Sequence, residues 1–402
     1  MAIAALVTLP AMIASAAPEF IDPGVVDLPL NWYRTASALA VSSDGSVVVG
    51  TSLSGFRWSK ETGIVRLGGL RLGEFDGAAE AVTADGRWIA GNVHASYQNP
   101  VPILWTSSGW TRRIDFGEAS QSTGYAKDVS ADGQFVVGHY ERPSGEEAFI
   151  WSASTGMQFI GKLPSAEASF ATAISANGTI VAGFSNTAFL WTSELGMLDL
   201  GTYGNHDHSA VLGLSADGTV AVGHAYSDED GGVALVWRDG VLQAPLDVPG
   251  AVASTARAAN RDGGVIVGSY RVEGMTRGFV WTAETGAIDL TLFAESLGLD
   301  LQGATLAIPK AISDDGSTIV GSYYPIDVER AFILRDLPLG DNRCSPCAAD
   351  FDGDGGVTGG DLAAFMVAYE AGARCADVDD DSVVDGNDVA AFLAAFERGG
   401  CE

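Results

Sequence analysis

A short hairpin phrase recurs seven times and constrains the fold more than any other feature of the chain. In its cleanest copy an apolar strand ends at Ser130, Asp132-Gly133 follow, and a second strand runs from Phe135 to Gly138. Glycine accepts the positive φ of a tight hairpin turn. The turn glycine recurs at Gly45, Gly86, Gly133, Gly178, Gly218, Gly263 and Gly316. Successive copies lie 40 to 53 residues apart, a period typical of propeller blades.

Two further strands follow each hairpin. Phe149-Ile-Trp151 predicts a third strand, and Met157–Ile160, after the turn at Gly156, predicts a fourth. We therefore expect a mainly β fold, a seven-bladed β-propeller with four-stranded blades. The tryptophan that most blades carry favours packing between blades over a ligand cage, because one indole buries a large apolar area.

The last copy lacks an outer strand. After Ala331–Leu334 the chain offers no glycine turn, whereas Gly24–Leu28 near the N-terminus matches the outer strands Gly196–Leu200 and Gly286–Leu290. We predict that this N-terminal segment closes the last blade, which removes two exposed sheet edges. A longer insertion, Thr291–Lys310, precedes the last blade and predicts a short helix over Leu292–Leu297.

The repeated phrases carry a family resemblance. Residues 36–335, with their Phe-x-Trp runs and Ser-x-Asp-Gly hairpins, resemble the bacterial extracellular repeat family named HAF. Ile103-Leu-Trp105 and Ala234-Leu-Val-Trp237 depart from the family phrase, since they lack its phenylalanine. The resemblance implies a propeller and secretion, and it implies no activity.

Charge and the N-terminal residues bear on location. The formal net charge of −29 disfavours nucleic acid and anionic membranes as partners, because no cluster of Lys and Arg could neutralise phosphates. Residues 1–17 are apolar and end in a small-x-small pattern, which predicts a secretory signal cleaved after Ala16 or Ala17. We expect a soluble mature protein that is secreted or held at the cell surface.

The chain divides into four expected segments: a signal at 1–17, the propeller at 18–337, a linker at 338–343 and a C-terminal module at 344–402. All four cysteines lie in the module: Cys344, Cys347, Cys375 and Cys401. In an exported chain they favour two disulfides. We expect Cys347–Cys401 with Cys344–Cys375 among three possible pairings. A zinc site is the weaker alternative, because the last two cysteines do not form a close pair.

Two aspartate-rich segments in this module match the twelve-residue EF-hand loop. The first runs from Asp350 to Asp361 and the second from Asp377 to Asp388. Ca²⁺ takes six to eight oxygen ligands, which this spacing brings together. The expected ligands of two Ca²⁺ ions are Asp350, Asp352, Asp354, Gly356, Thr358, Asp361, Asp377, Asp379, Asp381, Val383, Asp385 and Asp388. Ser382 replaces the usual glycine of the second loop, so we expect a weaker second site.

Each loop opens an amphipathic helix, and the two helical sequences are nearly identical. The pair of loop–helix units resembles a type I dockerin, which implies calcium binding and a cohesin-like or cell-envelope protein partner. Gly359-Gly360 and Gly386-Asn387 stand where cellulosomal dockerins carry partner-contacting residues, so the partner's identity does not carry over. An aspartate-rich linker that binds nothing is the alternative. Loop phase, duplication and helix faces together disfavour it.

No pattern predicts a catalytic site. His206-Asp207-His208 could ligate a metal, but a polar surface loop is the favoured interpretation because no second ligand cluster accompanies it. The serines before each Asp-Gly are interpreted as turn residues. The favoured function is a non-catalytic binding or scaffold protein with a possible glycan or protein ligand on the propeller face. The alternative is a propeller enzyme acting on extracellular polysaccharide, such as a glycoside hydrolase or lyase.

Overall fold

The structure is a computed structural model of the 402-residue chain. It describes residues 17–24, 35–52, 54–69, 77–94, 99–107, 111–114, 123–227, 231–324, 328–339, 349, 351, 357, 359–370, 378 and 386–398.

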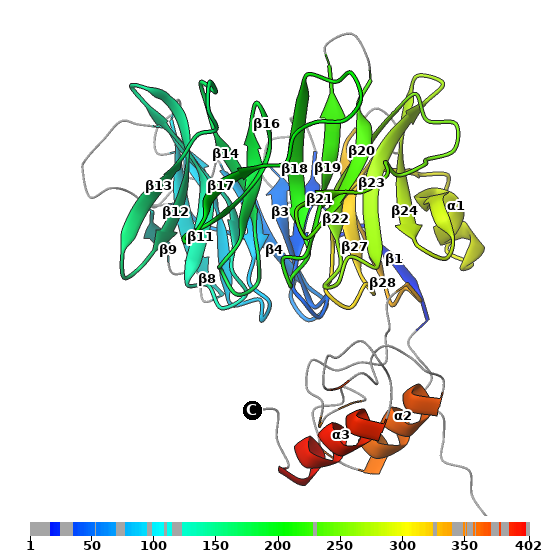
Figure 1. The fold of residues 1–402 in the computed structure, drawn as a ribbon. Helices are drawn as coiled ribbons and strands as arrows, with labels where there is room; N and C mark the ends of the chain where they lie inside the picture. The colour runs from blue at the N-terminus through cyan, green and yellow to red at the C-terminus, as the bar shows by residue number, and fades with distance from the viewer. Residues whose placement is uncertain are drawn as a thin grey trace, which may run out of the picture.

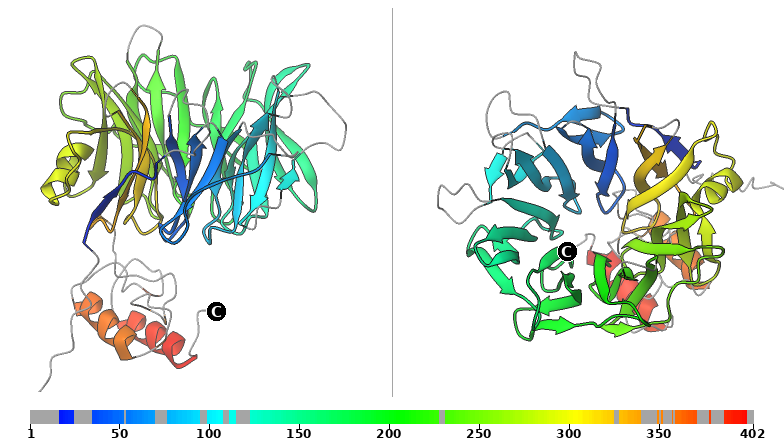
Figure 2. Two further views of the ribbon diagram at one scale, coloured as in Figure 1. Left: turned by 180° about the vertical axis from the view of Figure 1, so that it is seen from behind. Right: turned by 90° about the horizontal axis from the view of Figure 1, so that it is seen from above.

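Seven four-stranded antiparallel sheets form the blades of a propeller around a central axis (Figures 1 and 2). Strands run outward from the axis in chain order within each blade, except that the outer strand of the seventh blade comes from the N-terminus. The predicted mainly β seven-bladed fold is therefore confirmed.

Blade 1 comprises β2 (Ser37–Val41), β3 (Val47–Ser52), β4 (Ser54–Ser59) and β5 (Gly63–Arg66), and blade 2 comprises β6 (Gly77–Val82), β7 (Trp88–His94), β8 (Pro100–Thr106) and β9 (Thr111–Arg113). Blade 3 comprises β10 (Gly124–Val129), β11 (Phe135–Arg142), β12 (Gly145–Ser152) and β13 (Gly156–Gly161). Blade 4 comprises β14 (Phe170–Ile174), β15 (Val181–Ser185), β16 (Thr187–Thr192) and β17 (Gly196–Asp199). Blade 5 comprises β18 (His208–Leu214), β19 (Val220–Tyr226), β20 (Val233–Arg238) and β21 (Val241–Leu242). Blade 6 comprises β22 (Ala253–Ala259), β23 (Val265–Val272), β24 (Met275–Thr282) and β25 (Gly286–Asp289). Blade 7 comprises β26 (Thr305–Ile312), β27 (Ile319–Tyr324), β28 (Arg330–Arg335) and β1 (Glu19–Ile21).

The Ser-x-Asp-Gly phrase builds the turn between the first two strands of a blade. In blade 1 the Ser42 hydroxyl donates to Asp44 Oδ1 at 2.7 Å and accepts from the Val47 N–H at 2.9 Å. Gly45 has a φ of 72°, the conformation that this turn requires. The same contacts recur at Ser130 and Asp132 of blade 3. The interpretation of these serines as turn residues is confirmed.

The same turns link neighbouring blades. In several blades the residue after the turn serine donates its N–H to the equivalent carbonyl of the next blade, as from Ala131 to Ala176 at 3.0 Å. The link from Asp314 of blade 7 to Ser43 of blade 1, at 3.1 Å, continues the pattern across the joint between the last and first blades. The ring is thus closed by hydrogen bonds as well as by packing.

The outer strand of blade 7 differs from the predicted one. Residues 19–21 form β1, which pairs with β28 so that Phe20 faces Leu334 and Ile21 faces Ile333. Gly24 lies beyond the end of β1, and the rest of the predicted segment, residues 25–28, lies outside the described residues. Closure by an N-terminal strand is confirmed. The predicted position of that strand, Gly24–Leu28, was wrong.

A polar cluster fixes this register. Asp22 Oδ2 accepts from the Tyr323 hydroxyl at 2.9 Å and from Arg330 at 2.7 Å. Blade 6 holds an equivalent cluster, in which Asp289 accepts from Tyr270 and Arg277. Burial and the bond to Asp22 raise the pKa of Tyr323 to about 12. Asp22 therefore occupies in blade 7 the place that Asp289 occupies in blade 6.

The core lies between the blades. Second strands such as β3 are almost wholly buried, as expected of strands covered on both faces. Trp58, Trp105, Trp151 and Trp237 are each at most 5% exposed, which confirms the packing interpretation of the tryptophans. The predicted short helix before the last blade is also confirmed as α1 (Leu290–Ser296), capped by Asp289.

Two helices follow the propeller in the chain, α2 (Gly359–Glu370) and α3 (Gly386–Arg398). They lie side by side outside the ring of blades (Figure 1). Each begins at the tenth position of its predicted loop, two residues before the aspartate that ends the loop.

Candidate functional site

A β-bulge at the same position in all seven inner strands shapes the central channel. In β10, for example, the pairing with β11 skips Lys127, which lies between Ala126 and Asp128. A bulge leaves its extra residue unpaired and re-aims its side chain. We call the seven residues skipped in this way the bulge ring: Leu39, Glu80, Lys127, Thr172, Leu212, Arg257 and Lys310.

The bulge ring lines a central cavity of about 250 Å³. All seven of its members are among the lining residues, together with small residues of the inner strands and turns. The volume is close to the lower end of the range for small-molecule sites. The cavity is therefore a candidate site for a small molecule.

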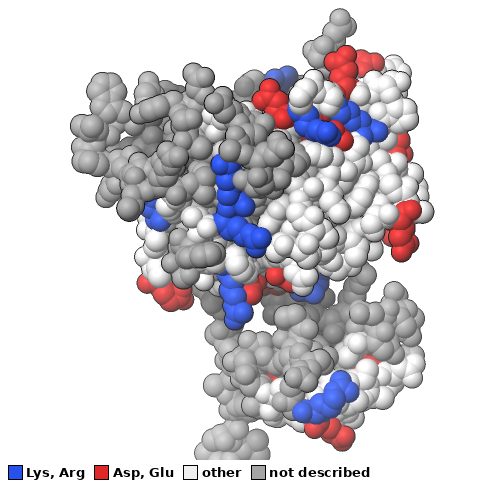
Figure 3. Space-filling model, turned by 90° about the vertical axis from the view of Figure 1, so that its left-hand side faces the viewer, with Lys and Arg blue, Asp and Glu red and all other residues white. Residues whose placement is uncertain are grey.

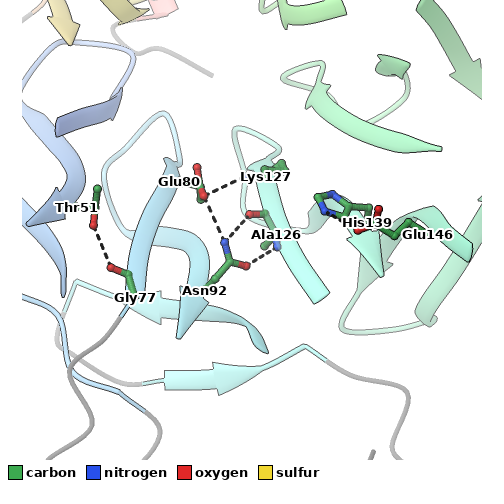
Figure 4. A network of polar contacts seen from close by, with 8 residues as sticks. All are labelled: Thr51, Gly77, Glu80, Asn92, Ala126, Lys127, His139 and Glu146. Carbon is green, nitrogen blue, oxygen red and sulfur yellow. Dashed lines mark hydrogen bonds and ion pairs between the residues drawn. The ribbon is translucent and has the colours of Figure 1, made fainter. Parts of the chain in front are cut away.

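Hydrogen bonds fix one side of this cavity (Figure 4). Lys127 Nζ lies 3.0 Å from Glu80 Oε1, so an ion pair joins blades 2 and 3. The Asn92 side chain also spans the two blades: its Oδ1 accepts from the Ala126 N–H at 2.7 Å and its Nδ2 donates to the Ala126 carbonyl at 3.3 Å. Glu80 is thus held in a structural network.

Aromatic and histidine side chains line blades 3 and 4 beside Lys127. Tyr125 stacks on His139, which meets the edge of Phe170, which stacks in turn on Phe184, with ring centroids 4.7 to 4.9 Å apart. Lys127 Nζ lies 5.6 Å from the centre of the Tyr125 ring. The aromatic cluster therefore adjoins the charged cavity.

Two histidines of the second strands are held neutral. Burial, and then the charge of Lys127, lower the pKa of His139 to about 4. Burial and Arg257 lower the pKa of His224 to about 4 in the same way. Within the described part of the chain, Nδ1 of each is buried without a hydrogen-bond partner. The sequence carried no signal for these two positions, because other blades hold Thr51 and Asn92 there.

Asp128 follows the bulge residue of β10. The other six inner strands carry alanine or glycine at this position. Asp128 Oδ1 accepts from the Val129 N–H and its Oδ2 from the Ile174 N–H of the next blade, both at 2.8 Å. Burial raises the pKa of this carboxyl to about 7, although both hydrogen bonds favour the charged form.

The raised pKa of Asp128 predicts a pH-dependent stability. Between about pH 4 and pH 7 the folded chain holds a proton that the unfolded chain releases, so the free energy of unfolding should fall as pH rises through this window. We expect Asp128→Asn to remove this part of the fall and to gain stability over the natural chain above pH 7. Urea unfolding of both chains at pH 5 and pH 8 checks this. A difference between them that does not change with pH would contradict it.

Two of the predicted calcium ligands lie on the C-terminal helices. Asp361 and Asp388 lie in the first turns of α2 and α3, and both are fully buried. Asp388 Oδ1 accepts from the Val378 N–H at 2.6 Å. The two carboxylates hold equivalent places, since each is the twelfth residue of its loop.

The two helices pack through equivalent residues. Phe365 and Phe392, each four residues after its aspartate, stack with centroids 4.2 Å apart and planes 1° apart. Phe351 meets the edges of both rings. A small, fully buried aromatic core thus joins the two loop–helix units symmetrically.

The other ten predicted ligands lie outside the described residues: Asp350, Asp352, Asp354, Gly356, Thr358, Asp377, Asp379, Asp381, Val383 and Asp385. So do the four cysteines and residues 1–16 of the predicted signal. Within the described residues, no group of three or more His, Cys, Asp or Glu side chains could hold a metal ion. The two described members of the set, Asp361 and Asp388, are carboxylates, the kind of oxygen ligand that Ca²⁺ prefers.

His206-Asp207-His208 has ordinary contacts. The His208 ring packs against Tyr226 with centroids 5.3 Å apart, and the Asp207 N–H donates to the Ser227 hydroxyl at 3.0 Å. The interpretation of this segment as a polar loop and strand start agrees with these contacts.

Comparison with known proteins shows a fold and no more. No protein-family model matches the chain, and no curated protein matches it. The β-propeller domain of Cps50 (Swd1) from Myceliophteria thermophila is similar, with 11% identity, a TM-score of 0.50, and coverage of 76% of this chain and 97% of that one. TolB from Acinetobacter baumannii has 14% identity and a TM-score of 0.37 over 51% of this chain. The match spans about half of the TolB chain, 52%.

On the face shown in Figure 3, charged side chains of both signs are set in a broad uncharged surface. No helix among the described residues is long and apolar enough to cross a membrane.

Proposed function

We propose that the chain is a secreted or surface-associated binding and scaffold protein. In this proposal a HAF-type propeller presents a binding face, and a dockerin-like C-terminal module attaches it to a protein partner when calcium is bound. Two Ca²⁺ ions would be held by the two aspartate-rich loops, where they would neutralise the carboxylates and order the loops.

The observation that carries this proposal is the pairing of equivalent residues in α2 and α3. A linker without structure would have no reason to bury Asp361 and Asp388 at the same position of two successive helices. It would also have no reason to stack Phe365 on Phe392. Both contacts support a duplicated loop–helix module, and an isolated pair of such short helices needs a further source of stability.

The proposal predicts calcium-dependent capture of one partner. We would immobilise the full chain and a chain that ends at Leu339, and expose both to envelope proteins of the source organism. With calcium, the full chain should retain the partner, while the shortened chain and the full chain in EGTA should not. An Asp350→Ala/Asp377→Ala chain should also lose it, and the exposed propeller variant Asp247→Ala should keep it.

A partner that stays bound in EGTA, or that binds the shortened chain equally well, would contradict attachment through the module. Cleavage of an envelope polysaccharide by the shortened chain would instead favour the alternative, a propeller enzyme.

A further inference from the structure

The central cavity is lined by three basic and three acidic side chains. Two of the acidic ones, Asp128 and Asp314, are bound by groups outside the bulge ring. The chain has 22 Lys and Arg against 51 Asp and Glu, yet three of the seven bulge positions are basic. Glu80 is the only acidic member of the ring, and it pairs with Lys127. Arg257 and Lys310 are neighbours around the ring, on blades 6 and 7, and have no acidic partner within it.

These two cations are held at a cost to the fold. Arg257 Nε donates to the uncharged Ser269 hydroxyl at 3.2 Å. Lys310 is half-buried and makes no hydrogen bond or ion pair within the described ranges of the chain. Burial, and then the charge of Arg257, lower the pKa of Lys310. Glu329 and Glu80 raise the pKa of Lys310, but each has a smaller effect than burial and Arg257. Two neighbouring, half-buried cations in a cavity repel each other, and such arrangements cluster at binding sites.

The geometry points to a binding site for a small organic acid in the central cavity, with its carboxylate held by Arg257 and Lys310. A guanidinium and an ammonium form charge-assisted hydrogen bonds to a carboxylate that are stronger than neutral ones. The 250 Å³ volume limits the ligand to a small molecule. Leu39 and Leu212 supply apolar wall on the same ring for its carbon skeleton.

This inference is independent of the calcium module, because every residue it uses belongs to the propeller. Calorimetric titration of the full chain, in low salt, checks it with D-glucuronate and succinate as probes. D-glucose is the uncharged control and sodium sulfate the inorganic anion. We expect one acid per chain, no heat with glucose, and weaker binding at high salt.

Variants separate a binding role from a structural one. Lys310→Gln should weaken binding of the acid about tenfold or more, because it removes a charged hydrogen-bond donor. The same variant should leave the melting temperature of the acid-free chain unchanged or higher, because it relieves repulsion with Arg257. Lys310→Arg should retain binding. Lys60→Gln is the exposed control, in the turn between β4 and β5. It should change neither the affinity for the acid nor the melting temperature.

Arg257→Gln serves as a second variant, and it should also weaken binding. Absence of heat with both acids would overturn the inference. So would binding of sulfate without either acid, or unchanged affinity in a folded Lys310→Gln chain.

Discussion

A chain that lacks residues 18–24 is expected to melt on the order of 10 °C lower than the full chain and to form oligomers. The deletion removes β1, so β28 becomes an exposed edge with a row of unpaired backbone groups. It also uncovers the core cluster of blade 7 against which Phe20 packs. Exposed edges pair with other chains, and oligomers are the direct consequence.

The loss of Asp22 explains much of this effect. Without it the half-buried Tyr323 hydroxyl and Arg330 lose an acceptor, which costs about 1–3 kcal/mol for each unsatisfied group. Asp22→Ala should therefore lower the melting temperature by itself. Glu19→Ala, on β1 just before Asp22, is the matched control. Its ion pair with Lys60 is exposed and should contribute less than about 1 kcal/mol.

Differential scanning calorimetry and light scattering of the deletion chain measure both expectations. A monomer with an unchanged melting temperature would contradict closure through β1.

Chelation of calcium is expected to unfold α2 and α3 and to leave the propeller intact. The helices have 12 and 13 residues, too few to persist alone in water. Their shared core is small, so carboxylate repulsion in the loops should oppose folding until an ion is bound. Each proposed ion would add about 2.7 kcal/mol of stability when present at a hundred times its dissociation constant.

Hydrogen exchange of the full chain, read by mass spectrometry, resolves this effect by segment. Peptides that cover 359–370 and 386–398 should lose protection in EGTA, while peptides from β3 and β23 should not change. Magnesium at the same concentration is the control for non-specific ionic strength. Equal protection of both helices with and without EGTA would contradict a calcium-dependent fold.

The blade repeat could be predicted from the sequence because each blade repeats the same local rules. A turn glycine with positive φ and a serine that hydrogen-bonds within the turn each depend on residues close in sequence. The closing strand could not be placed as securely. Both Ile21-Asp22 and Val26-Asp27 repeat the Ile288-Asp289 phrase of blade 6. Contacts with Tyr323 and Arg330, about 300 residues away in sequence, favour the first.

The bulge ring was missed for a physical reason. A bulge is a property of how two strands pair, and the variable position between Ala126 and Asp128 shows only a lysine in the sequence. Seven such positions, on seven strands, become one lining only when the ring closes. The proposed calcium loops can be found in the sequence because their expected ligands follow one another within twelve residues, from Asp350 to Asp361 and from Asp377 to Asp388.

Calorimetric titration of calcium into the full chain tests the central claim most directly. We predict two sites on the natural chain, with the second weaker than the first because of Ser382. Asp350→Ala should leave only the second site, Asp377→Ala only the first, and Asp247→Ala both. A chain that gives no calcium-specific heat, or that keeps both sites in the two loop variants, would contradict a calcium-dependent attachment module.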